Sequence, residues 1–132
     1  MCAAFCAPEL AIVRAHVTTK GLPNDHEIRF AQVGQKLTAG FYVFKFERDA
    51  MTEQPNLECS LRVLDKDGEH EMGKPAASQI NNGVDKRAMF AEIALPFDIA
   101  DPGTFILEFK VFDKVAKKQA VKRVPFAVLD AK

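Results

Sequence analysis

The sequence has no tryptophan and one tyrosine, and it carries no net charge because 18 basic residues balance 18 acidic ones. Proteins that bind nucleic acid or anionic membranes over a broad surface need an excess of positive charge. The balance therefore argues against both classes. No segment reaches the ~18 apolar residues that a membrane-spanning helix requires. A basic start followed by an apolar run, which would mark a signal peptide, is also missing. We therefore expect a cytoplasmic protein with no membrane span, although a chain trimmed of its signal would give the same pattern.

Cysteine is scarce as well. The three cysteines are Cys2, Cys6 and Cys59, and an odd number without regular spacing does not fit a disulfide-rich secreted scaffold. Cys59 alternates with Leu61 and Val63, which predicts a reduced thiol in the core that acts as a small apolar side chain. The short ligand spacings of zinc sites are missing too. We therefore predict no metal centre and no cofactor.

Amphipathic segments of helical length are absent, and apolar residues recur instead with a period of two, which is typical of half-buried β-strands. The segments with this pattern are 9–19, 27–30, 40–47, 57–64, 87–95, 102–113 and 120–129. Turn residues separate them, and residues 73–86 form the longest stretch without a pattern, which predicts a loop. Seven to eight short strands with such turns predict an all-β, antiparallel sandwich. The length fits a single domain over 9–132, with 1–8 as an N-terminal tail or first edge segment.

Apolar residues also occupy strand positions that an ordinary sandwich leaves polar. Phe41 and Val43 alternate with Tyr42, Phe44 and Phe46, which we expect to face the core. In the same way, Ile106 and Phe112 lie on the outer face of their strand, whereas the alternate residues of 105–111 are predicted to face the core. If these strands are neighbours, Phe41, Val43, Ile106 and Phe112 form an exposed apolar patch of the kind used for protein association. The alternative is that the N-terminal segment or the loop at 73–86 covers them.

A basic run surrounds the turn between the last two strands. It consists of Lys114, Lys117, Lys118, Lys122 and Arg123. The simpler interpretation is a solubilising hairpin tip that discourages pairing between sheet edges. The functional interpretation is a salt-sensitive contact with an acidic partner. No aromatic residues interleave with these lysines at the tip, so a site for single-stranded nucleic acid is not expected.

The closing hairpin also carries a family resemblance. The segment Pro102-Gly103-Thr104-Phe105, its continuation to Asp113, and the return strand with Pro125-Phe126 resemble the last two strands of bacterial immunoglobulin-like domains. The resemblance implies a domain that binds, spaces or scaffolds rather than one that performs a given reaction. Phe105 stands where many relatives have tyrosine, which excludes the hydrogen bond of a tyrosine corner.

Catalytic patterns are not apparent. Ser60 is an outward residue within a strand, and Ser78 has no glycine-flanked elbow around it. We therefore predict a non-enzymatic protein-interaction or structural module, self-associating or bound to another protein. The alternative is a domain that binds a small ligand or calcium with loop carboxylates. These would come from Asp65, Asp67, Asp98 and Asp101.

Overall fold

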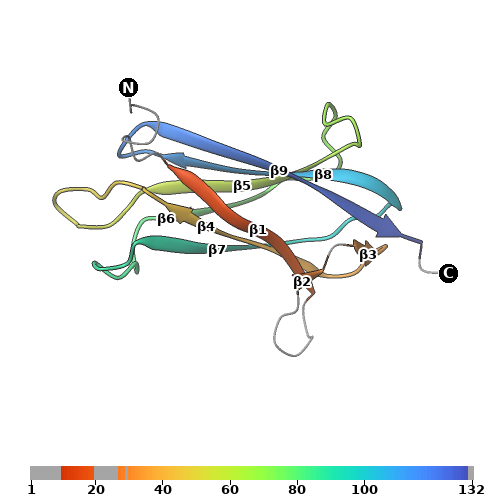
Figure 1. Cartoon of the computed structure of the whole chain (residues 1–132), viewed down its shortest axis with the longest axis horizontal. Helices are drawn as coiled ribbons and strands as arrows, with labels where there is room; N and C mark the ends of the chain where they lie inside the picture. The colour runs from red at the N-terminus through yellow and green to blue at the C-terminus, as the bar shows by residue number, and fades with distance from the viewer. Residues whose placement is uncertain (1–9, 20–26, 29, 131–132) are drawn as a thin grey trace, which may run out of the picture.

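The computed structural model describes residues 10–19, 27–28 and 30–130, and within these residues the regular elements are all β-strands, arranged in two facing sheets (Figure 1). The four-stranded sheet has the order β2 (Glu27–Ile28), β1 (Ala11–Thr19), β4 (Leu37–Phe44), β7 (Phe90–Phe97). The five-stranded sheet has the order β3 (Phe30–Gln32), β9 (Lys118–Leu129), β8 (Gly103–Asp113), β5 (Leu57–Leu64), β6 (Ala76–Ile80). The all-β prediction is confirmed. The predicted tail at 1–8 lies outside the described residues.

Strand direction differs from the prediction in one place. The strands of the four-stranded sheet pair antiparallel, as do β5, β6, β8 and β9. The short strand β3, however, pairs parallel to the end of β9, with Phe30 opposite Ala127. The prediction of a purely antiparallel sandwich is therefore wrong at this edge. The chain reaches this edge because it passes from β2 in the four-stranded sheet to β3 in the five-stranded sheet within a few residues.

The core lies between the two sheets and follows the expected alternation in β5 and β8. Leu57, Cys59 and Leu61 are buried on β5, and the odd-numbered positions from Phe105 to Val111 are buried on β8. The rings of Phe41 on β4 and Phe109 on β8 meet edge to face across the sandwich, with centroids 5.4 Å apart. Both rings are fully buried. This pair joins the two sheets at the centre of the core.

The alternation of β4 is opposite to the prediction. Phe41 and Val43 are fully buried, whereas Tyr42 and Phe44 are partly exposed on the outer face. Lys45 has φ 66°, a left-handed conformation that ends the strand and shifts the alternation. Phe46 consequently packs against the core although it follows Tyr42 and Phe44 at even spacing.

A β-bulge in β1 has the same effect. The register with β4 shifts between Val13 and His16, and Arg14 has φ 57°. Because the bulge reverses the facing of the strand, Val13 is exposed whereas Val17 is buried. The strand β6 also differs from the prediction, because it forms within the stretch at 73–86 that the sequence predicts as a loop.

Asp113 at the end of β8 is a fully buried carboxylate. Its Oδ2 accepts a hydrogen bond from the backbone N–H of Glu47 at 2.9 Å. Its Oδ1 accepts from the N–H groups of Val115 and Ala116 at 3.0 and 3.1 Å. The side chain thus shapes the turn that leads to β9 and ties it to the segment after β4.

None of the described residues forms a helix of the length and hydropathy needed to cross a bilayer. The cytoplasmic location stays a prediction.

Candidate functional site

The predicted interface residues do not form one surface. Phe41 and Val43 lie in the core and expose no area. Ile106 and Phe112 are partly exposed on the outer face of the five-stranded sheet. The prediction of a joint outer patch is therefore wrong for the β4 residues, because the sequence placed their strand with the opposite facing. Phe112 remains as an outward aromatic residue.

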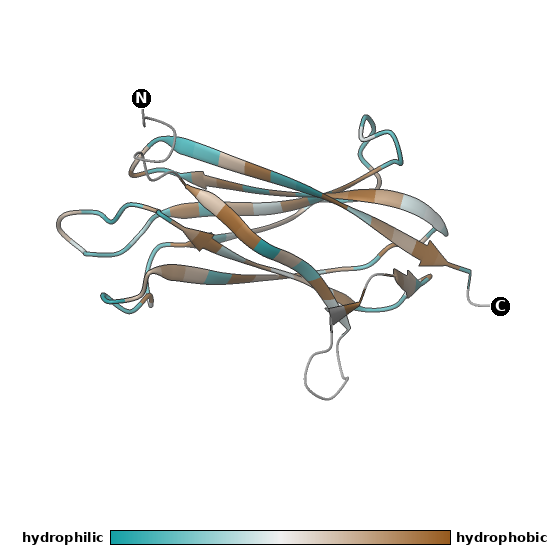
Figure 2. Cartoon of the chain, viewed as in Figure 1, coloured by the Kyte–Doolittle hydropathy of each residue, from teal (hydrophilic) through white to brown (hydrophobic). Residues whose placement is uncertain are grey.

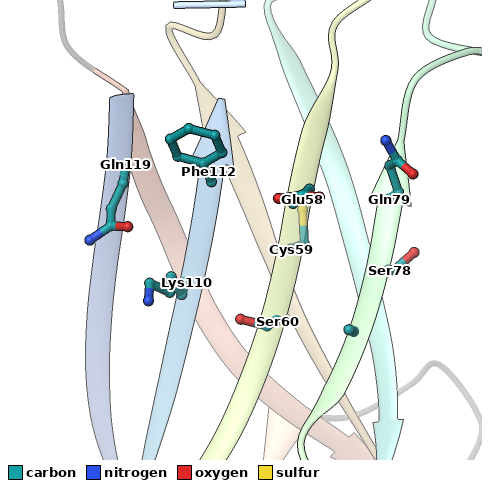
Figure 3. A pocket seen from close by; sticks show the side chains of 9 residues that line it. Glu58, Cys59, Ser60, Ser78, Gln79, Lys110, Phe112 and Gln119 are labelled. Carbon is teal, nitrogen blue, oxygen red and sulfur yellow. The ribbon is translucent and has the colours of Figure 1, made fainter. Parts of the chain in front are cut away.

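Phe112 lies in a shallow hollow of about 600 Å³ on this outer face (Figure 3). The strand register sets side chains from β9, β8, β5 and β6 in rows across it. The first row is Gln119, Phe112, Glu58, Gln79, and the second is Val121, Lys110, Ser60, Ala77. The hollow thus combines an aromatic ring with amide, hydroxyl, carboxylate and ammonium groups. Its volume lies within the range of about 300–1,000 Å³ that is common for small-molecule sites.

The polar groups around the ring differ in how they are held. Gln79 Nε2 donates a hydrogen bond to Asn56 Oδ1 at 3.0 Å, which fixes this amide beside Glu58. Within the described part of the chain, the side chains of Gln119 and Ser60 have no hydrogen-bond partner. Two polar side chains in the hollow are therefore free to bind a ligand.

The charges at the hollow are unevenly paired. Glu58 Oε2 lies 3.1 Å from Lys114 Nζ, so this carboxylate is partly neutralised. Lys110 makes no ion pair with any described residue. Of the predicted basic run, Lys114 pairs with Glu58 and Arg123 with Glu108. Lys117, Lys118 and Lys122 are exposed, and Figure 2 shows β9 hydrophilic at its start and again in its middle.

A row of arginines and glutamates borders the hollow. Glu108 is nearly buried and lies between Arg62 and Arg123 on the neighbouring strands. Arg62 Nε donates to Glu108 Oε1 at 2.8 Å, and Arg123 Nη2 donates to Glu108 Oε2 at 2.9 Å. Burial alone would raise the pKa of Glu108, but the hydrogen bonds and charges of the two arginines outweigh it and hold the pKa below its usual value. Glu108 therefore stays ionised, and its charge is already compensated.

The loop carboxylates that the sequence proposes as a cation site do not gather as a set of metal ligands in the described part of the chain. Asp65 Oδ1 accepts from the N–H of Glu69 at 2.9 Å, and Asp65 Oδ2 lies 2.9 Å from His70 Nδ1. The backbone hydrogen bond from Glu69, followed by the side chain of His70, lowers the pKa of Asp65 to about 2. Asp98 and Asp101 line a different hollow, beside Phe97. Across residues 10–19, 27–28 and 30–130, no three His, Cys, Asp or Glu side chains cluster as a metal site would require.

Cys59 borders the Phe112 hollow from the core side and is 1% exposed. Burial raises the pKa of its thiol to about 12. A thiol with this pKa is protonated at neutral pH and is a poor nucleophile. The prediction of a buried, apolar role for Cys59 is confirmed.

A second aromatic cluster lies on the outer face of the four-stranded sheet. The ring of Phe90 on β7 lies 5.3 Å from that of Tyr42 and 5.3 Å from that of Phe44. Phe90 is 44% exposed and Val13, on the neighbouring β1, is 38% exposed. We call Val13, Tyr42, Phe44 and Phe90 the outer aromatic cluster. The sequence missed it because the facing of β4 is reversed.

The comparisons with known proteins find a likeness among solved structures. No protein-family model matches the chain. A search of curated proteins finds no match either. Among solved structures, the chain is similar to a family 123 glycoside hydrolase from Clostridium perfringens, studied for hydrolysis of glycolipid glycans, with a TM-score of 0.53 and 12% sequence identity. The similarity covers 92% of this chain and 27% of that chain, so the present chain spans about a quarter of the length of the hydrolase.

This likeness corrects the prediction that the protein is not an enzyme. The chain it resembles is that of a glycoside hydrolase, so the prediction of a non-enzymatic module is withdrawn. At 12% identity the likeness shows the fold alone. It assigns no catalytic residue to this chain.

Proposed function

We propose that this chain is a β-sandwich domain that binds a carbohydrate in the hollow around Phe112. The observation that carries the proposal is the outward Phe112 ring, set among the side chains of Gln119, Glu58, Gln79, Ser60 and Lys110. This develops the small-ligand alternative of the sequence analysis and moves the site from the loop carboxylates to a sheet face.

The chemistry of the hollow fits a sugar ring. One face of a pyranose presents C–H groups that pack on an aromatic ring, whose face carries partial negative charge. The hydroxyl groups around the edge of the sugar then need donors and acceptors in the same plane. Amide, carboxylate and hydroxyl side chains in rows beside Phe112 supply both kinds of group. The activity of the structurally similar hydrolase on glycolipid glycans adds support for this ligand class.

An immunoglobulin-like topology is part of the proposal. In immunoglobulin domains the second and fifth strands share one sheet, and the third, sixth and seventh share the other. The arrangement of β4 with β7 and of β5, β8 and β9 supports the same assignment. Antibody domains join the two sheets with a disulfide between the second and sixth strands. Here the Phe41–Phe109 pair bridges the corresponding strands.

Phe112→Ala is the direct test of the binding site. Aromatic residues at the centre of a site often contribute most of the binding energy, so we expect an affinity loss of about tenfold or more. The measurement is binding of fluorescently labelled protein to an array of immobilised neutral, sialylated, uronate-containing and sulfated oligosaccharides.

The matched control is Phe90→Ala, which removes a partly exposed ring from the opposite sheet. We expect this variant to bind as the original protein does. Equal binding by the original protein and by Phe112→Ala, or no binding of any glycan by the original protein, contradicts the proposal.

The outer aromatic cluster supports a second candidate function, association with a second copy of this chain. The strand β7 is an edge of the four-stranded sheet; it has no lysine among its eight residues, but it carries Glu92 and Pro96. Pro96 removes one N–H donor near the end of this edge, whereas residues 90–95 keep the backbone N–H and C=O groups with which another strand edge can pair. Pairing of the β7 edges of two copies about a two-fold axis joins their four-stranded sheets. It also brings the outer aromatic clusters of the two copies together, so that the same patch forms the contact on each copy.

Phe90→Glu is expected to convert a dimer into a monomer because it sets a charge into the contact between the two clusters. The measurement is molar mass by light scattering on a sizing column. Ile106→Glu, on the outer face of the other sheet, is the control and should leave the dimer intact. A monomeric original protein, or a dimer that survives Phe90→Glu, contradicts association through this face.

A further inference from the structure

The charges around the hollow narrow the kind of glycan that it can accept. Glu58 is the acidic residue that lines the hollow. Its Oε2 lies 3.1 Å from Lys114 Nζ, so a ligand meets a neutralised pair there rather than a bare carboxylate. The charge of the adjoining row is likewise compensated, because Glu108 is held between Arg62 and Arg123 and Arg62 also reaches Glu71 at 3.5 Å.

Lys110 is the exception among these groups. It lies on β8 two residues before Phe112, on the same face of the sheet, with Ser60 opposite on β5 and Val121 opposite on β9. No described residue forms an ion pair with it. An ammonium group is a compact, strongly hydrated point charge with three donors, so a nearby anion gains a charge-assisted hydrogen bond. Among the residues that the structure describes, the hollow therefore presents the positive charge of Lys110, without an ion-pair partner, next to its aromatic ring.

We propose that the ligand is an acidic glycan, with one sugar ring on Phe112 and its carboxylate or sulfate group bound by Lys110. This rests on the proposed function and adds the charge of the ligand to it. Phe112 and Lys110 are alternate residues of one strand, so their Cα atoms lie about 7 Å apart. This spacing matches a sugar ring that stacks on the first residue while its acidic substituent reaches the second. Ser60, whose hydroxyl has no partner among the described residues, lies beside Lys110 and can donate to the same anion.

The array described above separates the ligand classes. The expected result is binding to uronate-containing, sialylated or sulfated glycans and little binding to neutral ones. Binding to uronate-containing or sialylated glycans identifies the anion as a carboxylate, and binding to sulfated glycans alone identifies it as a sulfate. Binding to neutral glycans that Phe112→Ala abolishes overturns the acidic ligand while the carbohydrate site stands. No glycan binding at all overturns both.

Lys110→Gln supplies the test on the protein side. A charge-assisted contact predicts an affinity loss of about tenfold for the best acidic glycan of the array, measured by titration calorimetry. The same variant should bind the matching neutral glycan, prepared by methyl esterification or desulfation, as the original protein does. The control is Lys122→Gln, which removes the same charge from an exposed position of β9 in register with Phe109.

Loss of affinity in Lys110→Gln but not in Lys122→Gln supports a specific contact. Equal losses in both variants show general attraction by the basic run and overturn the assignment of Lys110. An unchanged affinity in Lys110→Gln overturns it as well. The far-ultraviolet circular dichroism and the unfolding midpoint of each variant show that the fold is retained.

Discussion

Phe109→Ala is expected to lower the free energy of unfolding by about 3–5 kcal/mol, the usual loss when a buried phenylalanine is truncated. The ring of Phe109 is fully buried and meets Phe41 edge to face at 5.4 Å. Truncation removes its contacts with both sheets and leaves a cavity at the centre of the sandwich. Because domains of this size are stable by about 5–15 kcal/mol, the loss is a large part of the total. Urea unfolding followed by circular dichroism measures it.

A double-mutant cycle with Phe41→Leu and Phe109→Leu isolates the contact between the two rings. Edge-to-face pairs contribute about 0.5–1.5 kcal/mol beyond the area that they bury, so we expect a coupling energy of that size. Phe30→Ala is the control because Phe30 is 58% exposed on a short edge strand, and its change should stay within about 0.5 kcal/mol. A loss for Phe109→Ala no larger than that for Phe30→Ala contradicts the central role of the ring pair.

The sequence predicts those strands best in which one face is clearly polar. In β5, Glu58, Ser60 and Arg62 separate the apolar residues, and both bounds and facing agree with the structure. In β4 both faces are apolar, so the alternation alone does not say which one is buried. The aromatic residues at 42, 44 and 46 suggest that their shared face is buried, and this is wrong for residues 42 and 44. Phe46 packs against the core because the left-handed conformation of Lys45 ends the alternation before it.

The strand β6 shows a second limit. Its sequence, Ala-Ala-Ser-Gln-Ile, contains a single β-branched residue and follows Pro75. Such composition has low β-propensity. The strand forms because β5 offers a free edge, with Leu57 opposite Ile80, and an edge of this kind is a tertiary feature that local propensity does not encode.

The sequence predicts only part of the candidate site. Phe112 stands out because it is an aromatic residue at an outward position of a well-predicted strand. Gln119, Glu58 and Gln79 come from three other strands, and they align with Phe112 only once the register is known. A shift of one residue in any pairing would turn these side chains to the opposite face. The pairing of Lys114 with Glu58, which leaves Lys110 without an ion pair among the described residues, depends on the same register.

Asp113→Ala is expected to destabilise the protein by about 3 kcal/mol, because three part-buried N–H donors lose their acceptor and each costs about 1 kcal/mol, the lower end of the usual 1–3 kcal/mol. The carboxylate is fully buried and accepts hydrogen bonds from the backbone N–H groups of Glu47, Val115 and Ala116. The first of these N–H groups belongs to the segment after β4 and the other two to the turn between β8 and β9. Without the carboxylate, the connection between the two sheets at this end loses its hydrogen bonds. Urea unfolding of the variant measures the loss.

Asp113→Asn is the informative control because it keeps the size of the side chain and one of its two acceptor oxygens. The amide oxygen can satisfy either Glu47 or the turn, but its NH₂ group then faces a donor, so we expect a loss smaller than that of Asp113→Ala but well above zero. Asp67→Ala removes an exposed carboxylate from another turn and should change the stability by less than about 0.5 kcal/mol. Equal stability of Asp113→Ala and Asp67→Ala would contradict the structural role of the buried carboxylate. The turn also positions Lys114, so destabilisation confined to this end of the sandwich should weaken its pairing with Glu58 at the edge of the proposed glycan site.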